Sequence, residues 1–440
     1  MRPDRMPWLP GLAVFALPVV LASTAGEAPS SPRRNLPVVA DVDVDAECRA
    51  LYGRGFSPLT SRAARPAPHR ERPAKGEVFR DPLAGTCVVR ATDHAQEPPT
   101  GFARNDYSRR QAFNADATRF IVQARGGAWH LYDANSLRWL RQLQGPHGDA
   151  EPQWDPRDPR TLLFLPDKGG LQLSRLDVEA NRARVVARFE GRLPWPGATR
   201  VWTRGEGSPS ADGRYWCFLA QSDDGRTLGA FSYDLREDAV IASHALDTSP
   251  DSISASPSGR WCVVSGERKD GGTVAWSRDF KRSRKLYEDS EHSDIARSSD
   301  GSDVYVWIDQ QGDGQLLMVD LDSGRRTPLL STWIAGSASS VHVSGKAFDR
   351  PGWVLVSTFN RKGGSSWLQE QLLAVQLRPD PRVVRLGFHH ARYKTYWSQP
   401  QATGDRDFGH VLFNSNWDGD KPDDVDAYLI RLPKGFPDAD

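Results

Sequence analysis

Residues 251–266 read D-S-I-S-A-S-P-S-G-R-W-C-V-V-S-G, and the interpretation of the whole chain starts from them. Small and polar residues lead into a Ser-Pro-Ser-Gly turn at 256–259, and the apolar run 261–264 follows it. Proline restricts φ and glycine tolerates positive φ, so the pattern predicts two short strands joined by a tight turn. One hairpin of this kind is only marginally stable on its own.

The same pattern recurs six more times along the chain. The copies lie at 113–122, 153–165, 208–220, 295–308, 343–358 and 400–414. Their spacing of roughly 40 to 55 residues is the period at which each repeat forms one four-stranded blade. The sequence therefore predicts an all-β fold, a seven-bladed β-propeller of antiparallel blades within residues 77–440. The blades are expected at 105–146, 149–192, 204–247, 250–289, 292–332, 339–388 and 396–434.

A ring of blades needs a device that closes it. Residues 85–93 (G-T-C-V-V-R-A-T-D) have a strand pattern before the first blade, and the last blade ends after three strands with D-A-Y-L-I-R-L at 426–432. A free sheet edge is a liability, and pairing these two segments removes it. We therefore expect the N-terminal strand to complete the last blade.

Composition and motifs exclude several classes of function. The 57 basic and 56 acidic residues give a net charge of +1, whereas a nucleic-acid-binding surface needs a clustered basic excess, so we expect no nucleic acid partner. The four cysteines have no C-x-x-C spacing, which argues against a structural zinc site. The sequence has no G-x-S-x-G motif, so it does not encode a self-contained serine peptidase.

Residues 1–25 have the pattern of a secretory signal peptide. Arg2 and Arg5 precede the apolar run 9–22, and residues 23–25 are small, as a cleavage site requires. The run is short for a membrane span, so we expect an exported protein, periplasmic or secreted, with no transmembrane anchor after cleavage. Residues 26–76 are interpreted as an N-terminal arm, in which 61–75 is rich in Arg, Ala and Pro and is typical of a flexible linker.

The cysteines and one acidic run complete the structural expectations. A Cys48–Cys87 disulfide would tie the arm to the propeller in an oxidising compartment, and two free thiols are the alternative. Cys217 and Cys262 occupy matching places in adjacent blades, where we expect small buried apolar side chains. Residues 418–426 (D-G-D-K-P-D-D-V-D) lack the spacing of an EF-hand loop, so we expect solvated charge there.

Three turns carry a resemblance to known propellers. The stretches S-A-D-G-R-Y (210–215), S-P-S-G-R-W (256–261) and S-S-D-G-S-D (298–303) resemble the WD-like repeats of TolB-type bacterial propellers. Similar repeats occur in oligogalacturonate lyases and in the propellers of prolyl-oligopeptidase-like peptidases. The resemblance covers roughly residues 105–434 and implies the propeller fold, which hosts many activities.

Residues just before the innermost strand of each blade converge around the central funnel of a propeller. At these positions the chain places charged or hydrogen-bonding side chains where small or apolar ones are usual. They include Arg109, Arg110, Gln111, Glu151, Glu206, Asp251, His292, Asp294, His342, Gln399 and Gln401. We expect a ligand site on this face. The alternative is a set of solvated funnel residues that bind water and one another.

His292, His342 and the Gln399/Gln401 pair come from three successive blades. Converging imidazoles could hold a divalent metal such as manganese or calcium, with Asp294 or Glu151 completing the shell. Oligogalacturonate lyases place histidines and a glutamine around manganese in this funnel, so the resemblance implies a metal at His292, His342 and Gln399. Where that family has paired histidines at the last of these strands, this chain has two glutamines, and an amide is the poorer ligand.

A basic and aromatic cluster leads into the last blade. It consists of His389, His390, Arg392, Tyr393, Tyr396 and Trp397. Arginine pairs with carboxylates and aromatic rings stack on sugar rings, so the cluster suits an anionic carbohydrate. The alternative is a polar loop whose aromatic rings pack between blades.

Two functions remain open. In the first, the protein is a polysaccharide lyase that cleaves a uronic-acid polymer by β-elimination. Arg109, Arg110 or a metal would neutralise the substrate carboxylate, and His292, His342 or Tyr396 would transfer protons. In the second, it is a non-catalytic TolB-like propeller that binds a glycan or a protein partner on the funnel face.

Overall fold

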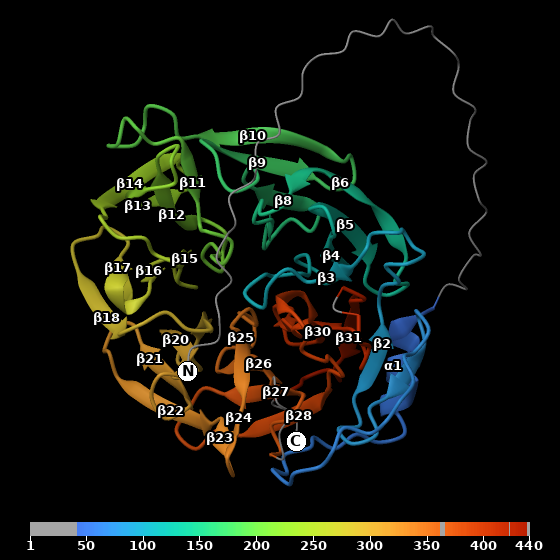
Figure 1. Cartoon of the computed structure of the whole chain (residues 1–440). Coiled ribbons are helices and arrows are strands. Elements are labelled where there is room, and N and C mark those ends of the chain that lie inside the picture. The colour runs from blue at the N-terminus through green and yellow to red at the C-terminus, as the bar shows by residue number, and fades with distance from the viewer. Residues whose placement is uncertain (1–41, 361–365, 422, 438–440) are drawn as a thin grey trace, which may run out of the picture. The chain divides into compact units, whose positions relative to one another are not determined.

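Antiparallel sheets follow one another around a ring in the computed structural model, which describes residues 42–360, 366–421 and 423–437 (Figure 1). Within this part of the chain, seven of these sheets have four or five strands, and each of the seven is one blade. In blades 1 to 6 the strands follow the sequence from the axis outward, whereas in blade 7 the N-terminal strands β2 and β1 lie outside β31 (Figure 1). The predicted seven-bladed all-β propeller is confirmed.

The blades are built from the following strands. Blades 1 to 3 contain β3 (Ala103–Arg104), β4 (Arg119–Ala124), β5 (Ala128–Asp133) and β6 (Trp139–His147); β7 (Gln153–Trp154), β8 (Thr161–Phe164), β9 (Gln172–Asp177) and β10 (Arg182–Arg188); and β11 (Arg200–Trp202), β12 (Tyr215–Gln221), β13 (Thr227–Asp234) and β14 (Ala239–Ala245). Blades 4 to 6 contain β15 (Ser252–Ala255), β16 (Trp261–Ser265), β17 (Thr273–Ser277) and β18 (Ser283–Tyr287); β19 (Ser293–Arg297), β20 (Asp303–Ile308), β21 (Gln315–Asp320) and β22 (Arg326–Ser331); and β25 (Ser340–Ser344), β26 (Trp353–Phe359), β27 (Gln371–Gln376) and β28 (Val383–Phe388). Blade 7 contains β29 (Thr403–Gly404), β30 (His410–Ser415), β31 (Asp426–Arg431), β2 (Cys87–Arg90) and, outermost, β1 (Val78–Arg80).

The Ser-Pro-Ser-Gly turn behaves as its residues predict. Strands β15 and β16 pair antiparallel, with Ala255 opposite Cys262, and the amide of Gly259 donates to the carbonyl of Ser256 at 2.8 Å. Gly259 has φ +70°, and a Cβ atom there would lie 2.4 Å from the ring of Tyr215 on the neighbouring blade. The turn therefore needs glycine both for its backbone conformation and for the close packing between blades.

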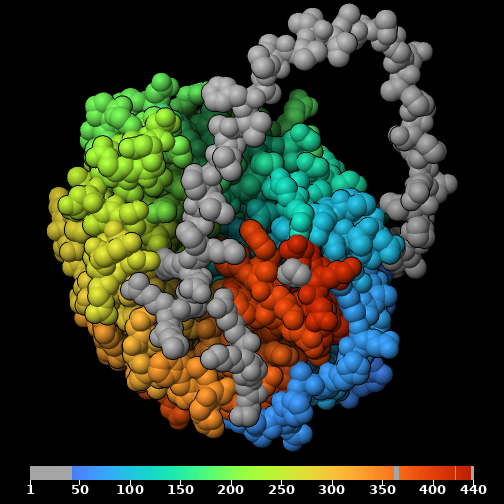
Figure 2. All heavy atoms as spheres, in the orientation of Figure 1, coloured from blue at the N-terminus to red at the C-terminus, as the bar shows by residue number. Residues whose placement is uncertain are grey.

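Both chain ends contribute to blade 7, as predicted. Strand β2 pairs antiparallel with β31, so residues 87–90 lie beside residues 428–431. Figure 2 shows the two ends of the chain, in blue and orange-red, in contact on one side of the ring. The acidic run is not uniformly solvated: Asp426 is fully buried and its carboxylate bonds to Arg90 (2.7 Å) and Thr92 (2.9 Å). The sequence alone does not reveal these contacts, because Arg90 and Thr92 lie more than 300 residues from Asp426.

The N-terminal arm contains one α-helix, α1 (Val44–Tyr52). Asp43 caps it by accepting a hydrogen bond from the amide of Ala46 (2.9 Å), and Val44, Cys48 and Leu51 form its buried face. Cys48 forms a disulfide with Cys87 of β2, so the bridge that the sequence left open is present and ties the arm to the closing strand.

A second disulfide joins Cys217 of β12 to Cys262 of β16, and the expectation of two buried thiols there was wrong. The two cysteines hold equivalent places on the second strands of neighbouring blades, and their Cα atoms are 5.7 Å apart. This separation is within the range that a disulfide spans. Whether the disulfide can form depends on the distance between the two blades, and the residues around either cysteine do not show this distance.

Other differences are local. Blade 3 begins with β11, a few residues before the predicted start at 204, and a two-stranded hairpin, β23 (Trp333–Ile334) with β24 (Ser337–Ala338), lies between blades 5 and 6. The linker region packs against blade 6, since Arg385 donates hydrogen bonds to the carbonyls of Ser61 (3.4 Å) and Ala63 (3.1 Å). The expected signal peptide, 1–25, lies outside the described residues. None of the helices in the described ranges is long and apolar enough to span a membrane.

Candidate functional site

Side chains from the inner ends of several blades meet on the propeller axis. Arg109 of blade 1 forms an ion pair with Glu206 of blade 3 (2.9 Å) and donates to the hydroxyl of Ser293 in blade 5 (2.8 Å). Gln111 reaches the carbonyl of Lys346 in blade 6 (3.4 Å). We call the end of the axis at which Arg109 and Glu206 meet the funnel mouth. The residues that form it are Tyr107, Arg109, Glu206, His292, His342, Tyr396 and Gln399.

The two funnel histidines stack on one another. The ring centres of His292 and His342 are 4.4 Å apart with an interplanar angle of 28°. Nε2 of His342 lies 2.7 Å from Oε1 of Gln399, which also accepts from Nε2 of Gln401 (3.2 Å), so the proton of the His342 ring is assigned to Nε2. His342 is 1% exposed, and its Nδ1 has no hydrogen-bond partner. Burial and the neighbouring His292 hold the pKa of His342 well below its usual value, so this ring is neutral at physiological pH.

These residues do not fit a divalent cation. Oε1 of Gln399 is already the acceptor of two hydrogen bonds, and the carboxylates expected to complete a shell are engaged elsewhere. Asp294 accepts from the amide of Gly345 (2.7 Å) and from Nζ of Lys346 (3.0 Å). Glu151 accepts from backbone amides of the loop that follows β11. With the Gln399 oxygen and both carboxylates engaged, the two stacked imidazoles of His292 and His342 remain as candidate ligands, and two ligands do not complete the shell of manganese or calcium.

Another possible metal-ligating group lies in the turn of blade 7. Asp405, Asp407 and His410 bring one ligand atom each within 4.8 Å of one another, and no other such triad of His, Cys, Asp or Glu occurs in the described part of the chain. Asp405 accepts hydrogen bonds from the amides of Gly409 (2.8 Å) and His410 (3.0 Å) and from the His410 ring. These contacts cap the turn, which accounts for the cluster without a cation.

The two funnel arginines are neutralised within the protein. Arg110 is 2% exposed and binds the carboxylate of Asp106 through Nε (3.1 Å) and Nη2 (3.0 Å), while Nη2 also donates to the carbonyl of Gly205 (3.0 Å). Burial lowers the pKa of Arg109, but Glu206 and nearby groups outweigh it and hold the pKa above its usual value. Both guanidinium groups are thus paired, and a small cavity of about 30 Å³ lies beside Gln111 and Lys346.

The remaining predicted polar residues support loops. Glu151, at φ +52°, is 2% exposed, and burial raises its pKa although the amides of Gly205 and Thr203 oppose the shift. His389 is fully buried, with Nε2 donating to the carbonyl of Thr358 (2.7 Å) and Nδ1 accepting from the amide of Ala391 (2.9 Å). Burial lowers its pKa to about 4. His390 stacks on Trp417 at 4.3 Å, away from the funnel histidines.

Tyr396 and Trp397 form an exposed aromatic platform beside the mouth. They are 45% and 41% exposed and lie in the short 3-10 helix η2 (Tyr396–Ser398), which a capping box between Thr395 and Ser398 holds. Desolvation of the phenol raises the pKa of Tyr396 against the effect of Arg104, and the carboxylate of Glu206, on the far side of the axis, raises it further.

Two residues of this region escaped the sequence interpretation. Arg104 lies beneath the platform, with its guanidinium 4.2 Å from the Trp397 ring centre, and Lys346 is a buried lysine paired with Asp294. Arg104 precedes the predicted start of blade 1 at 105 by one residue, so an earlier strand boundary would have revealed it. Lys346 follows the His342 strand and carries no local signal.

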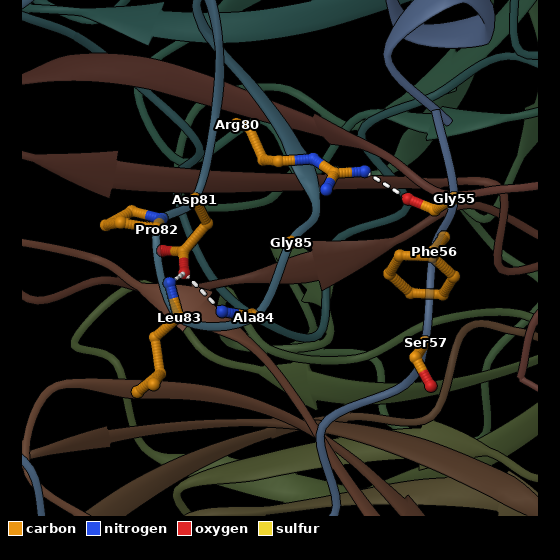
Figure 3. Close-up of a pocket in the computed structure, with 9 residues that line it drawn as sticks. All are labelled: Gly55, Phe56, Ser57, Arg80, Asp81, Pro82, Leu83, Ala84 and Gly85. Atoms are coloured by element: carbon orange, nitrogen blue, oxygen red, sulfur yellow. Dashed lines mark hydrogen bonds between the residues drawn. The ribbon is translucent and has the colours of Figure 1, made fainter. Parts of the chain in front are cut away.

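A cavity of about 500 Å³ lies apart from the funnel, between residues 55–57 of the arm and 80–85 of the closing segment (Figure 3). Its polar groups are engaged: Arg80 donates to the carbonyl of Gly55, and the Asp81 carboxylate accepts from the amides of Leu83 (2.9 Å) and Ala84 (2.6 Å) (Figure 3). This cavity belongs to the seam between arm and blade and has no convergent free polar groups.

No protein-family model and no curated protein matches the chain. Solved structures do match. An oligogalacturonate lyase in complex with manganese is 17% identical, with a TM-score of 0.58 over 81% of this chain and 96% of that chain. An oligogalacturonate lyase from Vibrio parahaemolyticus is 14% identical, with a TM-score of 0.57 over 81% and 96%. The WD40 domain of Neurospora crassa Pan2 is 11% identical, with a TM-score of 0.47 over 79% and 94%. The chain is thus a seven-bladed β-propeller whose fold is similar to that of oligogalacturonate lyases.

Proposed function

We propose that the protein is an exported propeller that binds an anionic carbohydrate at the funnel mouth. The observation that carries the proposal is the exposure of Tyr396 and Trp397, which lie next to one another beside the funnel mouth. The two rings meet edge to face at an interplanar angle of 82°, so each exposes its own apolar face with a polar edge. Sugar rings present the matching surface of C–H groups.

We favour binding over cleavage. β-Elimination needs a positive charge for the substrate carboxylate and a base that reaches the adjacent proton. Arg109 and Arg110 already pair with Glu206 and Asp106, and His342 is buried with its Nε2 bound to Gln399. A lyase would release an unsaturated uronate, so ultraviolet absorbance during incubation with a galacturonate oligomer tests this choice. A rise in absorbance that His342→Ala removes would overturn the non-catalytic proposal.

Export rests on two kinds of observation. The sequence begins with the pattern of a signal peptide, and the described chain contains two disulfides and no free cysteine. Disulfides persist in oxidising compartments and are rare in the cytosol. Fractionation of a tagged full-length chain in a bacterial host tests this, and a reduced protein confined to the cytosol would contradict it.

Calorimetric titration with a trisaccharide of galacturonic acid tests the binding proposal. Trp397→Ala should weaken binding about tenfold, which corresponds to about 1.4 kcal/mol, the order of one lost aromatic stacking contact. Trp333→Ala is the matched control, because Trp333 is 43% exposed but lies on the β23–β24 hairpin at the outer edge of the ring (Figure 1). Equal affinities of the two variants, or no binding by the unmodified protein, would refute the proposal and favour a protein partner.

A further inference from the structure

Arg104 is a buried arginine at the start of blade 1. It is 2% exposed, and its guanidinium donates to the carbonyls of Asn105 (3.2 Å) and Asp106 (2.8 Å) and to Oε1 of Gln123 (2.8 Å). All three acceptors are neutral, and its Nε has no hydrogen-bond partner. Among the described residues, no carboxylate forms an ion pair with Arg104.

The missing counterion sets Arg104 apart from its neighbours. Arg109 and Arg110 are also buried, and each has a carboxylate within 3.0 Å. Burial lowers the pKa of Arg104, and this effect outweighs the opposing influence of Tyr396 and of the Asp106 and Asp149 carboxylates. The Asp106 carboxylate is itself held by Arg110. Because buried charges are normally paired, Arg104 has the capacity to receive an anion.

Trp397 covers this guanidinium. The carbon of the guanidinium lies 4.2 Å from the Trp397 ring centre and 5.2 Å from that of Phe102, and the two rings stack at 5.8 Å with an angle of 22°. Trp397 is nevertheless 41% exposed and belongs to a three-residue helix outside the blades. Rotation of its side chain would therefore uncover Arg104 without disturbing a sheet.

We propose that Arg104 is a carboxylate-binding subsite of the funnel mouth, which Trp397 covers until a ligand displaces the indole. The expected ligand group is the carboxylate of a hexuronate, because a planar guanidinium binds a carboxylate through two parallel hydrogen bonds. The displaced indole can then stack on the same sugar ring. This inference rests on the proposed carbohydrate function and adds the residue that selects for charge.

The test compares a galacturonate trisaccharide with the same trisaccharide after methyl esterification of its carboxylates. The unmodified protein should bind the acid at least tenfold more tightly than the ester. Arg104→Met should remove this preference. Arg104→Lys keeps the positive charge but cannot donate two parallel hydrogen bonds to a carboxylate, so it should keep only part of the preference. Trp397→Ala should weaken both ligands yet retain the preference, because it exposes Arg104. Arg157→Met, in an exposed turn of blade 2, is the matched control and should bind as the unmodified protein does.

The outcomes separate the two proposals. Equal affinity of the unmodified protein for acid and ester would overturn the Arg104 subsite and leave carbohydrate binding in place. Failure to bind either ligand would overturn the proposed function itself. A preference that survives in Arg104→Lys unchanged, with an unaltered melting temperature, would also refute the subsite. The lysine and Trp397→Ala variants keep the test decisive if Arg104→Met does not fold.

Discussion

Asp426 should be the most sensitive single position in the closure of the ring. Its carboxylate is fully buried in β31 and receives Nε (3.1 Å) and Nη2 (2.7 Å) of Arg90, the hydroxyl of Thr92 (2.9 Å), the amide of His94 (2.8 Å) and a nitrogen of Arg72. These partners come from the arm and the closing segment, whereas Asp426 comes from the end of the chain. One side chain thus links both ends of the propeller.

Asp426→Ala removes the buried carboxylate that two guanidinium groups share, and leaves Arg72 only its pair with Asp424 (2.6 Å) and Arg90 only its pair with Asp93 (3.3 Å). Breaking a buried ion pair from one side costs about 3–5 kcal/mol, because the remaining charge stays desolvated. Folded proteins are stable by only about 5–15 kcal/mol, so the loss is large. The matched control is Asp420→Ala, since Asp420 is 83% exposed and pairs with Arg392 at 3.1 Å. An exposed pair of this kind contributes at most about 1 kcal/mol.

Urea unfolding followed by tryptophan fluorescence measures the free energies, and hydrogen exchange locates the damage. We expect Asp426→Ala to speed exchange in β1, β2 and β31 before the other blades, because these strands share the broken contact. A change in unfolding free energy below about 1 kcal/mol, equal to that of Asp420→Ala, would refute this account of closure. Loss of protection spread evenly over all blades would contradict its location.

Three further predictions concern turns, disulfides and pH. Gly259→Val should destabilise the protein by more than Gly301→Val, because both glycines have positive φ but only at position 259 would a Cβ meet another residue, Tyr215; equal melting temperatures would contradict this. Replacing Cys217 and Cys262 by serine should cost about 2–4 kcal/mol, since their bridge joins residues 45 apart; urea unfolding of the oxidised protein and the double variant checks it, and equal midpoints would argue against the bridge. Burial raises the pKa of Asp426, but hydrogen bonding to His94 and the charges of its arginine partners lower it to about 2 overall, below its unfolded value of 3.8. Its contribution of about 2 kcal/mol is therefore present above about pH 4 and lost between pH 4 and pH 2, so Asp426→Asn should flatten the acid limb of the stability curve.

The blade count could be read from the sequence because each turn is a local event. The stretch 256–259 contains the proline, the serines and the glycine that its hairpin needs, and the turns at 208–213 and 298–301 carry similar local signals. Closure of the ring was also predictable, because an unpaired strand at 85–93 and a three-stranded last blade require one another. The funnel positions of His292 and His342 followed from the same counting, although only His292 directly precedes its innermost strand, whereas His342 lies within β25.

The partners of the buried charges were decided by the tertiary structure alone. Whether Arg109 is free or paired depends on Glu206, almost 100 residues later, and Asp426 looked solvated within its acidic run although its partners lie at Arg90 and Thr92. Arg104 was hidden by a strand boundary placed one residue too late. The conformation of a turn depends on about four consecutive residues, so it can be predicted from the local sequence. Ion pairing and burial depend on the free energy of desolvating a charge, which is fixed only when distant blades come together.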